Sequence, residues 1–186
     1  AGSVSFSSSK IVSTGQGGCV VTNDATVADK VRKLKDFGRV SGGNDYHEIL
    51  GLNFKFTDLQ ACVGIAQMAK LADRVTRKKI IYQRYKDSLS GIDAVKFFAQ
   101  DLDITTPWFI DVLVDRRDEL MAHLKRHQVG SRIMYPPINK QPAYNLSGEH
   151  QVSNLIGVKG LWLPSAAQLT DSTVDYICDV IRCFYD

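Results

Sequence analysis

The chain has 186 residues, of which 44% are hydrophobic and 23% charged, and its formal net charge is +3. This composition is typical of a folded globular protein and excludes an intrinsically disordered chain. The charge is too small and too dispersed to indicate nucleic-acid binding, and no apolar stretch is long enough to span a bilayer, so neither a nucleic acid nor a membrane is an expected partner.

The first third of the chain predicts two strands and two helices. Short strands at residues 4–7 and 18–22 flank a glycine-rich loop, and Asn23-Asp24 then caps a helix with apolar residues at helical spacing. Residues 38–51 read as a loop with turn chemistry. Thr57-Asp58 begins a second helix that is apolar over most of its circumference, which predicts that this helix is buried.

A third helix is predicted at residues 73–89. It is basic and amphipathic, so we expect the Lys and Arg side chains between Arg74 and Lys86 to face water, and it is long enough to connect two lobes. From residue 90 onward strands and helices alternate, which describes a small α/β domain whose core includes Trp108 and Trp162. The expected strands are 95–98, 106–114 and 131–135. The expected helices are 115–128, 152–157 and 170–184.

The cysteines and histidines indicate no metal site. The four cysteines show neither a paired metal spacing nor a dense disulfide framework, so we expect reduced thiols in a cytoplasmic protein. His123 and His127 stand four residues apart on a charged helix, but the sequence shows no third ligand for a metal.

Lys10 is the residue with the most chemical information. It follows Ser5-Phe6-Ser7-Ser8-Ser9 and precedes Thr14-Gly15-Gln16-Gly17-Gly18. Such a lysine is either a solvated turn residue or an amine held where a cofactor aldehyde can reach it. Its position alone favours the solvated turn, and the other motifs of the chain reverse that preference.

Three segments together resemble the DegT/DnrJ/StrS-type sugar aminotransferases, which are pyridoxal-phosphate-dependent enzymes of fold type I. The first contains Lys10 and its glycine cluster. The second is Gly51-Leu52-Asn53-Phe54-Lys55-Phe56-Thr57-Asp58-Leu59-Gln60-Ala61, with Gly64 and Gln67. The third is Tyr135-Pro136-Pro137-Ile138-Asn139-Lys140-Gln141 with Leu163-Pro164. The resemblance covers essentially the whole chain.

The resemblance implies an α/β fold that corresponds to the carboxy-terminal part of such an enzyme. Residues 1–75 would be a remnant of the large cofactor-binding domain, 76–92 a connecting helix and 93–186 the small α/β domain. The chain begins inside a motif, so we expect it to have been cut from a longer one. The amino-terminal half of the family supplies the aspartate partner of the pyridine nitrogen, a stacking aromatic residue and much of the phosphate cradle.

The implied activity is transfer of an amino group, from glutamate, to a keto group of a nucleotide-linked sugar in deoxyamino-sugar and cell-surface polysaccharide biosynthesis. Lys10 would be the catalytic Schiff-base lysine that holds pyridoxal 5'-phosphate and then moves the proton. A histidine at this position would point instead to a dehydratase. Gln16 departs from the family, which commonly has Glu there.

The resemblance also implies a homodimer with shared active sites. Asn53 would reach the cofactor phosphate of the neighbouring copy, although a turn-forming role at a helix entrance is the alternative. For substrate binding it points to Lys55, Arg132, Tyr135, Asn139 and Lys140, each of which also has an ordinary surface or packing interpretation.

Two rival functions remain open from the sequence. The chain is either a catalytically incompetent fragment, whose cofactor site needs the missing half, or a non-enzymatic binding module that keeps the scaffold. A visible absorbance band from a cofactor bound to Lys10 would distinguish the enzyme from the incompetent fragment. Ligand binding that persists in Lys10→Ala would indicate the binding module.

Overall fold

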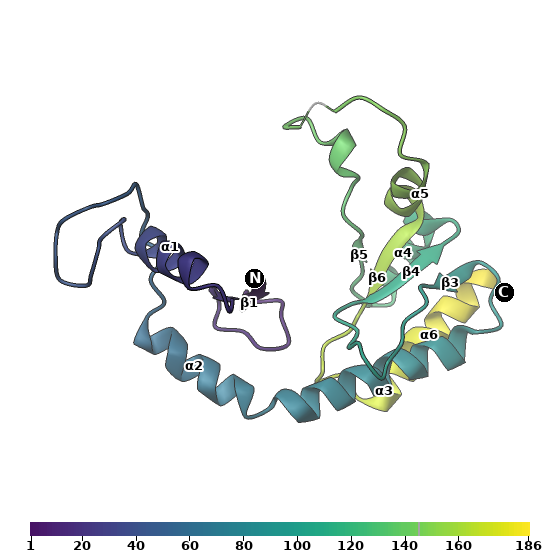
Figure 1. Cartoon of the computed structure of the whole chain (residues 1–186). Coiled ribbons are helices and arrows are strands. Elements are labelled where there is room, and N and C mark those ends of the chain that lie inside the picture. The colour runs from purple at the N-terminus through teal and green to yellow at the C-terminus, as the bar shows by residue number, and fades with distance from the viewer. Residues whose placement is uncertain (145) are drawn as a thin grey trace. The chain divides into compact units, whose positions relative to one another are not determined.

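The computed structural model describes residues 1–144 and 146–186, which form two compact units, Ala1–Asp73 and Arg74–Asp186. The first unit contains a two-stranded sheet and the second a four-stranded sheet, each accompanied by helices (Figure 1). The predicted mixed α/β architecture is therefore confirmed. The roles assigned to 1–75, 76–92 and 93–186 stay predictions.

The first unit begins with a hairpin whose long loop carries Lys10. Strand β1 (Gly2–Ser5) pairs antiparallel with β2 (Gly18–Val21), with Gly2 opposite Val21 and Ser5 opposite Gly18. The backbone N–H of Phe6 donates to the carbonyl of Gly17 at 2.8 Å and continues the ladder by one step. Both strands lie close to their predicted positions.

The two helices of this unit begin at capping residues. Helix α1 (Ala25–Lys35) starts after Asp24, whose carboxylate accepts hydrogen bonds from the backbone N–H groups of Thr26 and Val27. Helix α2 (Asp58–Met68) starts after Thr57, which forms a capping box with Gln60. Because caps satisfy N–H groups that have no partner inside the helix, these starting points could be read from the sequence.

The predicted burial of α2 is wrong for this chain. Leu59 is 82% exposed and Ile65 is 73% exposed, and α2 contains no fully buried residue. The side of α2 that includes Gln60, Gly64 and Gln67 is half-buried. A helix that is apolar all round can be buried, but its burial depends on which surfaces pack against it, and the helix sequence does not specify those surfaces.

The second unit is built on an antiparallel sheet with the strand order β3-β4-β6-β5. Its strands are β3 (Val95–Phe97), β4 (Ile110–Val114), β6 (Gly160–Leu163) and β5 (Arg132–Ile133). All four residues of β6 are buried, whereas β4 alternates between fully buried and half-buried positions. The register places Trp162 of β6 between Asp111 of β4 and Arg132 of β5.

Helices complete the hydrophobic core of this unit. Figure 1 shows α3 (Leu71–Leu89) and α6 (Asp171–Tyr185) running alongside each other, and Arg84 of α3 forms an ion pair with Asp175 of α6 at 2.6 Å. The remaining helices are α4 (Arg117–Arg126), the short 3₁₀ helix η1 (Ile138–Lys140) and α5 (Gln151–Lys159). The core residues include Ile81, Tyr85, Leu120, Leu161 and Ile181.

One lysine of α3 does not face water as predicted. Lys78 is 8% exposed, and its Nζ donates to the carbonyl of Trp108 at 2.7 Å and to Oγ of Ser165 at 3.3 Å. Burial lowers the pKa of this amine from its ordinary value of 10.5 to about 8. The amphipathic pattern missed this residue because a lysine inside a basic run resembles its solvated neighbours.

Lys78 should make the stability of the chain depend on pH in the alkaline range. Between pH 8 and 10.5 the unfolded chain retains a proton on Lys78 that the folded chain has released, so the free energy of unfolding contributed by this residue rises with pH. In urea denaturation, the free energy of unfolding of wild type minus that of Lys78→Met should therefore rise by at most about 1.4 kcal/mol per pH unit in this window. Below pH 8 this difference in the free energy of unfolding should not change with pH.

The neighbouring substitution Lys79→Met is the control for loss of a lysine from α3, because Lys79 is half-buried and lies one residue away on the same helix. A difference between wild type and Lys78→Met that is flat from neutral pH to about pH 10 would show that the Lys78 amine titrates normally.

Gly17 should be required for the observed conformation of the loop that carries Lys10. Its φ is +136°, and a Cβ at this position would lie 2.5 Å from a ring carbon of Phe56. Gly17→Ala should therefore destabilise the local structure by about 1–3 kcal/mol. Hydrogen exchange at the Phe6 and Thr14 amides, which both form backbone hydrogen bonds in this loop, would report the loss.

Gly42→Ala is the matched control, because a Cβ at Gly42 meets no atom within 4 Å. Equal protection of the Phe6 and Thr14 amides in the two variants would contradict the expected strain at Gly17.

Candidate functional site

Lys10 lies in the loop of residues 6–17 that closes the β1–β2 hairpin. Its backbone N–H donates to the carbonyl of Ser7 at 3.0 Å, which forms a turn, and the residue is half-buried. Further along, the Thr14 N–H donates to the carbonyl of Phe6 at 3.0 Å. The segment that carries Lys10 is thus closed at its base by backbone hydrogen bonds.

The carbonyl of Gln16 joins this loop to α2. It accepts a hydrogen bond from Thr14 Oγ1 at 2.7 Å and another from Gln60 Nε2 at 2.8 Å. The rings of Phe6 and Phe56 lie 6.2 Å apart and add an apolar contact between the same two segments. The first two sequence motifs therefore meet within one unit, and α2 supports the loop that presents the Lys10 amine.

Asn53 and Lys55 lie together at the end of α1. Asn53 forms an antiparallel bridge with Asp36, flanked by backbone hydrogen bonds from Phe37 to Leu52 and from Phe54 to Lys35. Lys55 Nζ is 3.2 Å from Asp36 Oδ1 and 4.8 Å from the ring centroid of Phe37. Asn53 is exposed, so its side-chain amide is accessible. Its backbone is held by the hydrogen bonds to the end of α1.

Arg132 and Tyr135 lie in the second unit, against a line of aromatic rings. We call the residues Trp108, Phe109, Trp162 and Tyr135 the aromatic stack. Neighbouring ring centroids are 4.4 Å apart for the first two pairs and 4.8 Å apart for Trp162 and Tyr135, which meet edge to face. The Arg132 guanidinium lies over both Tyr135 and Trp162, at 5.6 Å and 5.5 Å from the ring centroids. The structure therefore brings these two predicted residues together.

The Pro136-Pro137 turn packs against α5. A Cβ on Gly157 would lie 2.6 Å from Cδ of Pro137, so this close approach requires a glycine in the helix. The turn leads directly into η1, where Asn139 is half-buried and Lys140 is exposed.

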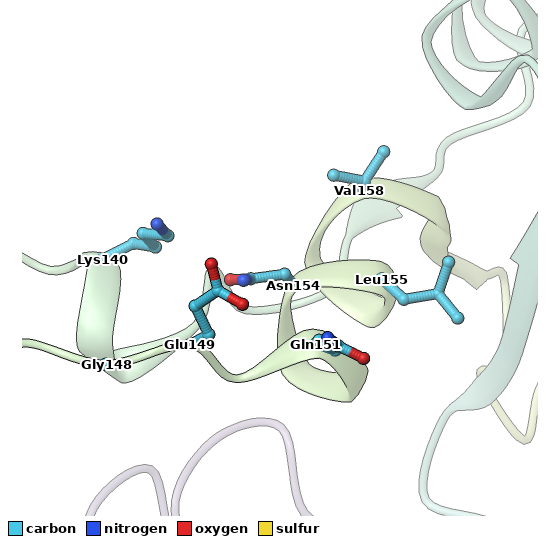
Figure 2. Close-up of a pocket in the computed structure, with 7 residues that line it drawn as sticks. All are labelled: Lys140, Gly148, Glu149, Gln151, Asn154, Leu155 and Val158. Carbon is cyan, nitrogen blue, oxygen red and sulfur yellow. The ribbon is translucent and has the colours of Figure 1, made fainter.

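Lys140 also lines a pocket of about 510 Å³ at the amino end of α5. Figure 2 shows Lys140, Glu149 and Asn154 gathered near the start of the helix, whereas Leu155 and Val158 lie further along it. The Oδ1 atom of Asn154 is buried and has no hydrogen-bond partner among the residues that the structure describes. The pocket thus offers an ammonium and a carboxylate to a polar ligand, whereas the Asn154 Oδ1 atom lies below its surface.

Sequence reasoning missed the contacts of three residues that position these groups. Gln60 belongs to the second motif, but its T-x-x-Q spacing after Thr57 says nothing about the hydrogen bond of its amide to Gln16. Phe109 and Lys78 gave no local signal, since stacking and burial depend on partners distant in the chain. The histidines of α4 lie with ring centroids 4.6 Å apart, and in the described part of the chain no group of three His, Cys, Asp or Glu side chains could hold a metal.

None of the helices in the described ranges is long and apolar enough to cross a membrane.

Similar proteins are sugar aminotransferases and related pyridoxal-phosphate enzymes. GDP-perosamine synthase of Escherichia coli O157:H7 is 31% identical over 185 residues, which are 97% of this chain and 50% of that protein. The putative pyridoxal phosphate-dependent aminotransferase EpsN of Bacillus subtilis is 27% identical, over 97% of this chain and 49% of that protein. This chain therefore spans about half the length of the curated relatives it matches.

Structural comparison agrees with the sequence matches. The crystal structure of a DegT DnrJ EryC1 StrS aminotransferase from Brucella abortus superimposes with a TM-score of 0.90 and 29% identity, over 99% of this chain and 50% of that one. This match confirms the predicted fold class and the predicted resemblance to one half of such an enzyme. The model of the DegT/DnrJ/EryC1/StrS aminotransferase family matches residues 1–182. The chain belongs to the DegT/DnrJ/EryC1/StrS aminotransferase family.

Proposed function

We propose that this chain supplies the catalytic lysine of a pyridoxal-phosphate-dependent aminotransferase. The enzyme moves an amino group, with glutamate as the donor, to a keto group of a nucleotide-linked sugar in deoxyamino-sugar biosynthesis. The observation that carries the proposal is the position of Lys10 on a loop whose Gln16 carbonyl is bound by α2. Membership of the family supports amino transfer, and the similarity to GDP-perosamine synthase supports a nucleotide-sugar substrate.

The residues around Lys10 fit pyridoxal phosphate. A primary amine is the group that bonds to an aldehyde, and Lys10 is only half-buried, so part of the residue is open to a small molecule. Gly15 leaves open space, because a Cβ there meets no atom within 4 Å. When bound, the cofactor supplies an electron sink for the substrate carbon that loses its proton.

Three side chains of the first unit have separate roles in this proposal. The Lys10 amine would take the proton from the substrate carbon and deliver it to the aldehyde-derived carbon of the cofactor. The exposed Asn53 amide donates a hydrogen bond to the cofactor phosphate bound by a second copy of the chain, which makes the enzyme a homodimer. Lys55 adds positive charge beside Asn53, and Asp36 holds its ammonium in place.

The second unit provides contacts to the sugar nucleotide. The Arg132 guanidinium lies over two rings and is exposed, so its N–H groups can pair with a diphosphate. Tyr135 and Asn139 border the sugar, and Lys140 contacts it from the pocket at the amino end of α5.

Lys10 should be the residue that pyridoxal phosphate labels. Adding the cofactor to the 186-residue chain should produce a visible absorbance band that borohydride removes, and peptide mass spectrometry should then find the reduced cofactor on Lys10. Lys10→Ala should lose both the band and the label. Lys30→Ala is the control, because Lys30 is an exposed lysine of α1 in the same unit.

Label spread evenly over surface lysines, with the same yield in Lys10→Ala, would contradict a cofactor site at Lys10. It would favour the binding-module or incompetent-fragment alternatives.

Asn53→Ala should weaken cofactor retention without moving the label from Lys10. A hydrogen bond to a charged group contributes about 1.5–3 kcal/mol, so the dissociation constant should rise at least about tenfold. Asn23→Ala, another exposed asparagine of this unit, is the control. Dissociation constants can be measured from the absorbance band.

Mixing the two variants tests whether sites are shared between copies. In a mixed dimer, the Asn53→Ala copy supplies Lys10 and the Lys10→Ala copy supplies Asn53, so tight retention should return in part. Retention that stays weak at every mixing ratio would rule out a site shared in this way.

A further inference from the structure

Lys78 joins three segments of the second unit. Its Nζ lies 2.7 Å from the carbonyl of Trp108, just before β4, and 3.3 Å from Oγ of Ser165, just after β6. The Ser165 hydroxyl is itself 3.5 Å from the same carbonyl. One buried amine of α3 thus holds the entrance of one strand and the exit of its neighbour.

The position of this link follows from the strand register. The last pair of the β4–β6 ladder at this end is Ile110 with Leu163. Within residues 1–144 and 146–186, no further pair of this ladder forms at this end of the two strands. Trp108 and Ser165 are each two residues beyond that last pair, and Lys78 bridges them where main-chain pairing has stopped.

Stability does not explain a lysine at this place. Both of its acceptors are uncharged, and desolvation is the cause of its lowered pKa. Among the described residues no carboxylate forms an ion pair with Lys78, and Asp171 of α6 pairs with Arg77 and Arg84 of α3. A buried ammonium that lacks a carboxylate partner costs more than an apolar side chain of similar size.

The link acts on the aromatic stack. Trp108 stacks on Phe109, Phe109 stacks on Trp162, and Trp162 supports Tyr135 and Arg132. Holding the Trp108 backbone in place therefore positions the first ring of the aromatic stack, against which Tyr135 and Arg132 pack.

We propose that Lys78 is a positioning residue that replaces the missing β4–β6 pairing and so holds the aromatic stack, with Tyr135 and Arg132, in one arrangement. That this arrangement matters for substrate binding rests on the proposed function. The link between Lys78 and the aromatic stack is independent of the proposed function.

Tryptophan fluorescence tests this directly, because the chain has two tryptophans and both belong to the stack. At neutral pH, Lys78→Met should shift the emission to longer wavelength and increase acrylamide quenching, while urea denaturation shows stability equal to or above that of wild type. Lys78→Arg, which keeps a cationic donor, should restore the wild-type emission. Lys79→Met should leave it unchanged.

Emission and quenching of Lys78→Met that match wild type and Lys79→Met would overturn the proposal. A shift that occurs only together with a matching loss of stability would also overturn it, because Lys78 would then be an ordinary core residue. Failure of the proposed function would be seen separately, as the absence of a cofactor label on Lys10 in the wild-type chain.

Discussion

The carbonyl oxygen of Gln16 is the point on which the candidate site depends. It accepts hydrogen bonds from Thr14 within the same loop and from Gln60 on α2, which uses the acceptor capacity of a carbonyl fully. Gln60 also accepts a hydrogen bond from the Thr57 N–H. An amide is suited to both tasks because it carries an acceptor and a donor, so one side chain starts α2 and attaches the Lys10 loop to it.

In the second unit, the central feature is β6, a strand that is buried along its whole length. β6 lies between β4 and β5, and its ladder with β4 ends at the pair of Ile110 and Leu163. Beyond that pair, Lys78 of α3 donates to the Trp108 carbonyl and to Oγ of Ser165. A charged side chain beside the core thus ties the ends of the two strands together.

Local chemistry made much of the fold predictable. Asp24, Thr57 and Thr170 are capping residues, and each begins its helix where the sequence places it. The sequence also predicts a strand over 106–114, and Ile110, Val112 and Val114 of β4 are all buried. The same local reasoning failed for α2 and Lys78. The apolar residues of α2 are exposed and a lysine in a basic run is buried, because burial is a property of the packing partners and periodicity describes the helix alone.

The sequence by itself determined the family, the caps of α1, α2 and α6, and the motif that contains Lys10, because these follow from residue type and spacing within short segments. It also predicted strands near β1 to β5 but did not predict β6. The tertiary structure decided how those segments support one another. It placed Gln60 against the Gln16 carbonyl, Asn53 and Lys55 beside Asp36, and Arg132 and Tyr135 on the aromatic stack. Most of these contacts join residues far apart in the chain, and hydrogen bonds, stacking and ion pairs form only when folding brings both partners to the same place.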